Sequence, residues 1–216
     1  MLGDRPYALL ALLNAVLCLN MPVLSFGLPL WVVRGTDAPA AMAAVVLVGN
    51  MLAVVVCQVR VARRVTDLAA AARATRRAGW LLCLACLGYA LSGLAAGPEL
   101  TVLALLSAAG VQVYGEMLHG AGSWEIGFGL ARPDRQGQYQ GLFAVGPQLA
   151  RMLGPALLTL LLISWGPPGW LVLGGLFLAA GAACGPVVRH AERAGPGGRT
   201  RWRGGARWRA RGTRAG

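Results

Sequence analysis

Six long apolar stretches dominate this 216-residue chain. A helix needs ~20 mostly apolar residues to cross a hydrocarbon core about 30 Å thick. Only 13% of the residues are charged, and the stretches lack the alternation of apolar and polar residues that is typical of membrane β-strands. We therefore predict an all-α integral membrane protein whose six transmembrane helices cover residues 7–33, 39–59, 78–96, 100–130, 137–164 and 169–188.

The arginine residues predict how these helices are oriented. The net charge is +12, and all 20 basic residues are arginines. Short loops rich in positive charge stay on the cytoplasmic side of a membrane. If the amino terminus is inside, every arginine except Arg34 and Arg151 falls in a cytoplasmic segment. The expected localisation is a multi-pass protein of the cell membrane with both termini in the cytoplasm.

Residues 191–216 differ in composition from the bundle of residues 1–190. They are rich in arginine and glycine and cannot bury enough apolar surface to fold alone, so we predict a disordered cytoplasmic tail. Basic residues beside a membrane are attracted to anionic lipid, which makes membrane lipids the expected partner. Nucleic acid is the weaker alternative, and a tail without any partner is a third.

Polar side chains are unevenly distributed among the predicted helices. Helices three and six contain no charged, asparagine or glutamine residue. Because a polar side chain facing lipid is costly, helices one, two, four and five should face one another or water, with three and six packed outside. The pattern recurs every three helices, as in transporters built from three-helix repeats. The candidate cavity residues are Asn14, Asn20, Asn50, Gln112, Glu116, His119, Gln148 and Arg151.

Two motifs of the fifth predicted helix resemble those of the major facilitator superfamily. Residues 133–141 read Pro-Asp-Arg-Gln-Gly-Gln-Tyr-Gln-Gly and resemble the family's proline-to-glycine stretch at the start of that helix. Gly154 and Pro155 follow and resemble the Gly-Pro motif of bacterial antiporters, although other glycines of that pattern are replaced. The resemblance covers about residues 4–190 and implies one six-helix half of such a transporter.

The loop between helices two and three indicates which half the chain resembles. Residues 58–64 keep the basic residues of the family's loop but lack its acidic residue and glycine. That departure is more typical of the carboxy-terminal half. The resemblance thus implies that helices one, two, four and five line the cavity, and that the amino-terminal half, with any proton-coupling acid in it, is absent from this chain.

Glycines and prolines in the fifth helix also have a physical interpretation. Gly137 and Gly141 lie four residues apart, and small residues on one face let neighbouring helices approach closely in lipid. Glycine is also common in membrane helices without such a role. Proline removes a backbone hydrogen bond, so Pro155, like Pro22, favours a bend of the kind that transporters use, though bends also occur without transport.

Glu116 and Arg151 form the sharpest site hypothesis. At ~1.5 Å per residue they lie about 18 and 21 Å from the inner membrane boundary, so their depths match. A buried arginine needs a partner, and we predict that the two form an ion pair or share a polar network with Gln112 and Gln148. Such a network is either a substrate-linked or proton-linked switch or a structural connection between helices four and five.

Other residues have two open interpretations each. His119 lies one turn from Glu116 and can act as a proton relay or as a plain polar contact. Asn14, Asn20 and Asn50 are cavity hydrogen-bonding groups or contacts between helices. Four aromatic residues at predicted helix ends are expected to anchor the protein at the membrane interface: Tyr7, Trp31, Trp165 and Trp170.

The remaining motifs argue against an enzyme. The five cysteines are odd in number and lie within predicted helices, so we interpret them as small apolar residues and expect neither a metal site nor a cofactor. We find no nucleophile elbow, phosphate loop or ATP-binding motif. A transporter would then be driven by an ion gradient.

The sequence therefore predicts secondary-active transport of a small molecule, with proton-coupled efflux as the expected form. The alternative is a truncated or accessory half-transporter without transport activity of its own, because alternating access requires two halves around a shared site. The expected partner is a second six-helix half, encoded upstream on the same chain, on a separate chain, or supplied by a second copy.

Overall fold

The computed structural model describes residues 5–131 and 135–194, and every regular element in this part of the chain is helical. The tail beyond residue 194 and the first two residues of the Pro133–Gly141 motif lie outside the described residues. The elements are α1 (Arg5–Leu17), α2 (Asn20–Pro22), the π-helix η1 (Val23–Gly27), α3 (Leu28–Gly35), α4 (Ala41–Ala62), α5 (Leu68–Ser92), α6 (Pro98–Gly129), α7 (Gln136–Thr159), the π-helix η3 (Leu160–Ser164) and α8 (Pro167–Ala194).

These elements form six long helical runs, because α1 to α3 follow one another and η3 continues α7. Five runs are long and apolar enough to cross a membrane. The exception is α5, which begins ten residues before the apolar stretch that predicted it and ends at Ser92. Its first turns carry Arg73, Arg76 and Arg77, which shorten the apolar part. The fold is an all-helical bundle compatible with a membrane protein.

Asp67 explains the early start of α5. Its backbone is extended, and its side-chain Oδ1 accepts a hydrogen bond of 2.6 Å from the backbone N–H of Ala70. An aspartate in this position accepts a hydrogen bond from one of the free N–H groups at the helix start. Its negative charge is also stabilised by the helix dipole. The helix therefore begins outside the apolar stretch.

We expect Asp67→Ala to lower the free energy of unfolding by about 1 kcal/mol, because the first turn of α5 loses its cap. The measurement is reversible unfolding in mixed detergent micelles. Asp37→Ala is the matched control, since Asp37 is an exposed acid in the loop before α4. Equal effects of the two substitutions would contradict the capping role.

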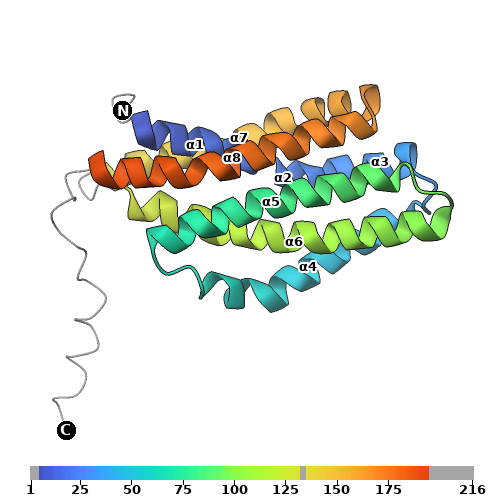
Figure 1. The fold of residues 1–216 in the computed structure, drawn as a ribbon, viewed down its shortest axis with the longest axis horizontal. Coiled ribbons are helices and arrows are strands. Elements are labelled where there is room, and N and C mark those ends of the chain that lie inside the picture. The colour runs from blue at the N-terminus through green and yellow to red at the C-terminus, as the bar shows by residue number, and fades with distance from the viewer. Residues whose placement is uncertain (1–4, 132–134, 195–216) are drawn as a thin grey trace, which may run out of the picture.

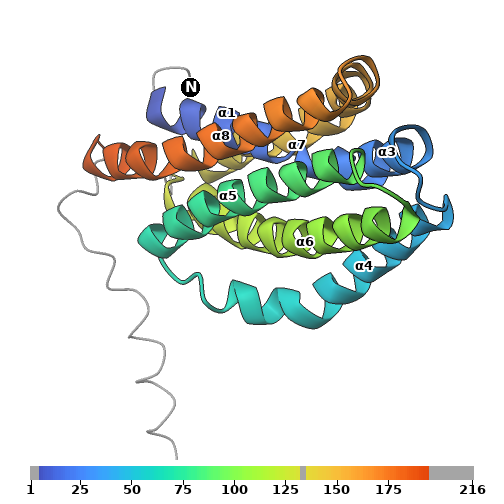
Figure 2. The same cartoon turned by 45° about the vertical axis from the view of Figure 1, so that its right-hand side comes forward.

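α5 packs between α6 and α8 (Figures 1 and 2). A Cβ atom on Gly79 would lie 2.6 Å from the carbonyl oxygen of Phe177 and 2.9 Å from Cα of Gly181. The backbones of α5 and α8 thus touch at two glycines, a form of packing that membrane helices favour. We expected helix three at the outside of the bundle, and the exposed side chains of Leu84 and Leu91 on α5 are consistent with that position.

α4 occupies the outer edge of the bundle next to α6 (Figure 1). Only 6% of its most apolar stretch is buried within the protein. Val55 and Met51 are among its exposed side chains. A helix this apolar and this uncovered is suited to contact with lipid or with another helical unit.

The glycines that bring α7 close to its neighbours differ from those predicted. Gly137 and Gly141 are exposed, and no described atom lies within 4 Å of a Cβ placed on either, so the prediction of close packing there was wrong. Gly154 does lie at a close contact, since its Cβ would be 2.5 Å from Cγ of Pro22. The adjacent Pro155 lies inside α7. Tight packing of α7 therefore occurs against the middle of the first run.

Aromatic residues form part of the core, which corrects the prediction of interfacial anchors. Trp170 and Tyr89 are fully buried with ring centroids 4.8 Å apart, and Trp31 meets Trp170 edge-on at 5.8 Å. Tyr7 is also buried, whereas Trp165 is exposed. Packing between α3, α5 and α8 therefore uses side chains that the sequence placed at a membrane surface.

Candidate functional site

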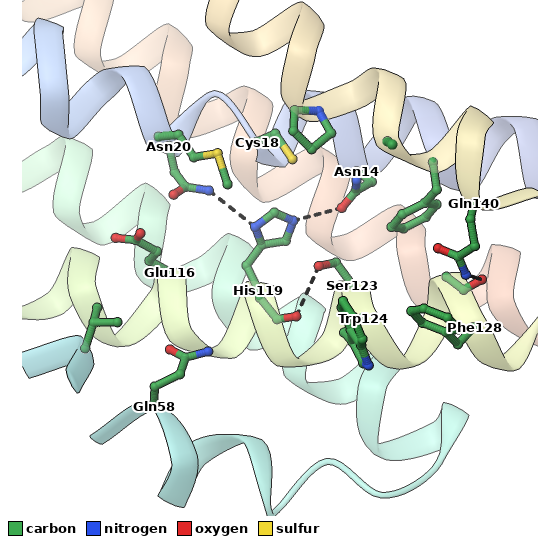
Figure 3. A pocket seen from close by; sticks show the side chains of 17 residues that line it. Asn14, Cys18, Asn20, Gln58, Glu116, His119, Ser123, Trp124, Phe128 and Gln140 are labelled. Atoms are coloured by element: carbon green, nitrogen blue, oxygen red, sulfur yellow. Dashed lines mark hydrogen bonds between the residues drawn. The ribbon is translucent and has the colours of Figure 1, made fainter. Parts of the chain in front are cut away.

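A cavity of about 440 Å³ opens between the first helical run, α4, α6 and α7 (Figure 3). Among the described residues its lining includes none from α5 or α8, which agrees with the predicted division of the helices. The lining residues are Asn14, Cys18, Asn20, Met21, Val54, Gln58, Glu116, His119, Gly120, Ser123, Trp124, Gly127, Phe128, Gln140, Phe143, Ala144 and Pro147.

The first helical run is interrupted beside this cavity. α1 ends at Leu17, and the N–H of Met21 bonds to the carbonyl of Cys18 instead of that of Leu17. The carbonyl of Leu17 thus lacks the helical hydrogen bond from Met21, and the side-chain amide of Asn20 donates to it instead. Interrupted helices are tolerated inside a membrane where the freed groups are buried in protein or line a cavity. The break therefore places Asn20 at the cavity.

His119 on α6 connects the two sides of this break (Figure 3). Its Nδ1 lies 3.3 Å from Nδ2 of Asn20, and its Nε2 lies 3.1 Å from Oδ1 of Asn14. Nδ2 of Asn20 also donates to the carbonyl of Leu17, so it is the amide nitrogen and His119 Nδ1 must accept from it. The imidazole is therefore the neutral form with its proton on Nε2, which donates to Asn14.

Gln112 extends the network toward α5. The Tyr89 hydroxyl donates to Oε1 of Gln112 at 2.7 Å, and Nε2 of Gln112 donates to the backbone carbonyl of Asn20 at 3.4 Å. Asn20, Gln112 and His119 are only 1, 2 and 4% exposed. Gln112 thus lies behind the cavity wall rather than in its lining, and a continuous set of hydrogen bonds links α5, α6 and the first run.

Glu116 is the acidic residue of the cavity lining. Its carboxylate lies near the side chain of Asn50 on α4 and is stabilised by it. Asn50 itself is partly buried beside the cavity and is not part of its lining. The structure therefore brings together four predicted residues at the cavity, Asn14, Asn20, Glu116 and His119, and keeps Asn50 and Gln112 in contact with them.

The predicted ion pair between Glu116 and Arg151 is absent, and both residues lie in the described part of the chain. Arg151 and Gln148 are exposed on α7, outside the cavity lining. Arg151 is close enough to Cys18 to act on its thiol electrostatically. Depth along two helices gave the level of these residues but not the direction in which they point, which explains the error.

No protein-family model, curated protein or solved structure matches this chain. Within the described ranges, no group of three histidine, cysteine or acidic side chains is arranged to hold a metal ion. The chemistry of the cavity must therefore be argued from its own side chains: amides, one imidazole, one carboxylate and an aromatic end.

Several cavity residues escaped the sequence prediction. Ser123, Trp124 and Phe128 follow His119 along α6, where Ser123 lies four residues after His119 and Phe128 four residues after Trp124. This spacing places side chains on one side of a helix and was the available signal. At the same end, Nε2 of Gln140 on α7 donates to the carbonyl of Gly127 at 2.8 Å. No sequence signal identified that contact.

Proposed function

We propose that this chain forms one six-helix half of a secondary-active transporter, similar to the carboxy-terminal half of a major facilitator. The observation that carries the proposal is the cavity, which borders an interrupted helix and takes its lining from four of the six runs. Many transporters bind substrate beside discontinuous helices at the interface of such repeats. The cavity is then the passage for a small molecule.

The fold offers places where the bundle can bend during transport. The π-helix η1 follows Pro22, and α7 contains Pro147 beside the cavity and Pro155 deeper in the helix. Prolines and π-helices interrupt the regular hydrogen bonds that keep a helix straight. In our proposal both termini are cytoplasmic, a gradient drives the motion, and the direction is efflux.

A half-transporter without activity of its own is the second candidate. It is favoured by the exposure of α4, of which only 6% of the most apolar stretch is buried. A second six-helix unit packed on that side would cover α4 and close the cavity. Without such a unit, no second half can move against this one to open the cavity to each side of the membrane in turn.

Cysteine accessibility separates the two candidates without knowledge of the substrate. We replace the five native cysteines with alanine, introduce Ser123→Cys, and expose right-side-out and inside-out vesicles of source-cell membrane to a charged thiol reagent. Alternating access predicts labelling from both sides, about tenfold faster than the buried control Leu105→Cys, because reaction follows solvent access.

Labelling from one side only would reject the transporter proposal and favour the inactive half. Labelling from neither side would exclude a water-accessible cavity altogether. A second matched control, Val55→Cys, replaces the most exposed apolar side chain of α4 and reports whether the reagent reaches lipid-facing positions.

A further inference from the structure

Three buried oxygen atoms near the cavity have no hydrogen-bond partner: Oδ1 of Asn20, Oδ1 of Asn50 and Oε2 of Glu116. They come from the first run, α4 and α6. Figure 3 shows the side chains of Asn20 and Glu116 turned toward the same end of the cavity. Asn50 lies near the carboxylate of Glu116. An amide oxygen or an ionised carboxylate can only accept a hydrogen bond, so all three lack a donor.

The neighbouring donors are already engaged. The amide of Asn20 donates to Leu17 and His119, and His119 Nε2 donates to Asn14. Arg151 forms no ion pair with Glu116, although both residues are among those that the structure describes. Within residues 5–131 and 135–194, no cationic side chain forms an ion pair with this carboxylate, and burial of such a charge is unfavourable without a partner.

The number and charge of these acceptors match one chemical group. An ammonium carries a positive charge and three N–H donors, one for each oxygen. A water molecule supplies two donors and no charge. A hard metal ion such as calcium takes about six to eight oxygen ligands, more than the three that lie here.

Aromatic side chains gather at the other end of the cavity, where Gln140 also lies (Figure 3). Trp124 and Phe128 have ring centroids 4.6 Å apart, and Phe143 of α7 lies in the same lining. Trp124 follows Glu116 by eight residues on α6, a rise of about 12 Å. A ligand that fits both ends carries an ammonium group at one end and an aromatic or apolar body at the other.

We propose that the cavity binds a small primary amine, with its ammonium group held by Asn20, Asn50 and Glu116 and its body against Trp124 and Phe128. The inference rests on the proposed transport function and names its substrate class. The acid and the two amides give selectivity for a charged N–H donor. The aromatic side chains tolerate different bodies, since stacking on a ring has little chemical selectivity.

The first test varies the ligand and leaves the protein unchanged. The full chain in lipid nanodiscs is titrated with monodansylcadaverine, a fluorescent primary amine with an aromatic body. We expect saturable binding that is about tenfold weaker for the trimethylammonium analogue, which has the charge without N–H donors, and for the alcohol analogue, which lacks the charge. Equal binding of all three compounds would overturn the proposal.

The second test varies the protein. Glu116→Gln and Asn50→Leu are each expected to weaken binding of monodansylcadaverine about tenfold. Glu125→Gln is the matched control, because Glu125 lies on the same helix outside the cavity lining and should leave binding unchanged. Elution as a single symmetric peak in size-exclusion chromatography checks that each variant is folded. Unchanged affinity in Glu116→Gln would refute the site.

Two further readouts distinguish the possible failures. Displacement of the amine by sodium chloride, but not by choline chloride at equal ionic strength, would indicate an alkali-ion site and overturn the amine assignment. No amine binding, together with two-sided labelling of Ser123→Cys, would reject the substrate class and keep the transporter proposal. Amine binding with one-sided labelling would support the site and reject transport.

Discussion

Gly79→Leu is expected to lower the free energy of unfolding by about 3 kcal/mol, because a side chain here collides with the backbone of α8. A Cβ alone would lie 2.6 Å from the carbonyl oxygen of Phe177. A backbone atom cannot move aside as a flexible side chain can, so α5 and α8 must separate. Since α5 also packs on α6, the separation disturbs that contact as well.

Reversible unfolding in mixed micelles of SDS and a mild detergent measures this loss. Gly175→Leu is the matched control on α8, where a Cβ meets no atom within 4 Å. This control places the same large side chain in a helix at a position where it meets no backbone atom. Equal stability of the Gly79→Leu and Gly175→Leu variants would show that the contact between Gly79 and Gly181 is not tight.

His119→Leu is expected to lower the free energy of unfolding by about 2 kcal/mol, because it removes the hydrogen bonds to Asn14 and Asn20 inside the bundle and leaves Oδ1 of Asn14 without this donor. Leucine fills a similar volume, so the loss reports mainly on hydrogen bonding. The freed amide of Asn20 keeps its bond to the carbonyl of Leu17, which limits the effect.

A double-mutant cycle tests whether the bond between His119 and Asn14 carries this energy. If it does, Asn14→Leu should add less in the His119→Leu background than alone, since the two residues share one bond. His190→Leu on α8 is the control, because His190 is exposed. Additive effects of His119→Leu and Asn14→Leu would contradict a shared hydrogen bond.

Helix positions followed from the sequence with small differences in their bounds. The apolar stretch of residues 100–130 became α6, Pro98–Gly129, because a run of this composition has no other way to satisfy its backbone in lipid. α5 differed most, since a hydropathy argument counts apolar residues and does not detect a cap such as Asp67. The division into two three-helix repeats stays a prediction.

The candidate site was predicted in composition rather than in geometry. Asn14, Asn20, Glu116 and His119 meet at the cavity as their residue types suggested, since polar groups inside an apolar bundle seek one another. Arg151 is exposed on α7 and forms no ion pair with Glu116, and Gln112 bonds to Tyr89, a contact that no spacing in the sequence indicated. The aromatic end of the cavity was not foreseen.

The sequence by itself determined that the chain forms long apolar helices and which of them carry asparagine and glutamine side chains, because those properties depend on composition and on the cost of polar groups in lipid. Only the tertiary structure decided which side chains contact one another. Rotation of each helix about its axis left Arg151 exposed, brought Gly79 rather than Gly137 into close contact, and aligned Asn20 with His119. That rotation is set by the packing of all the helices together, and the sequence of a single helix does not contain this information.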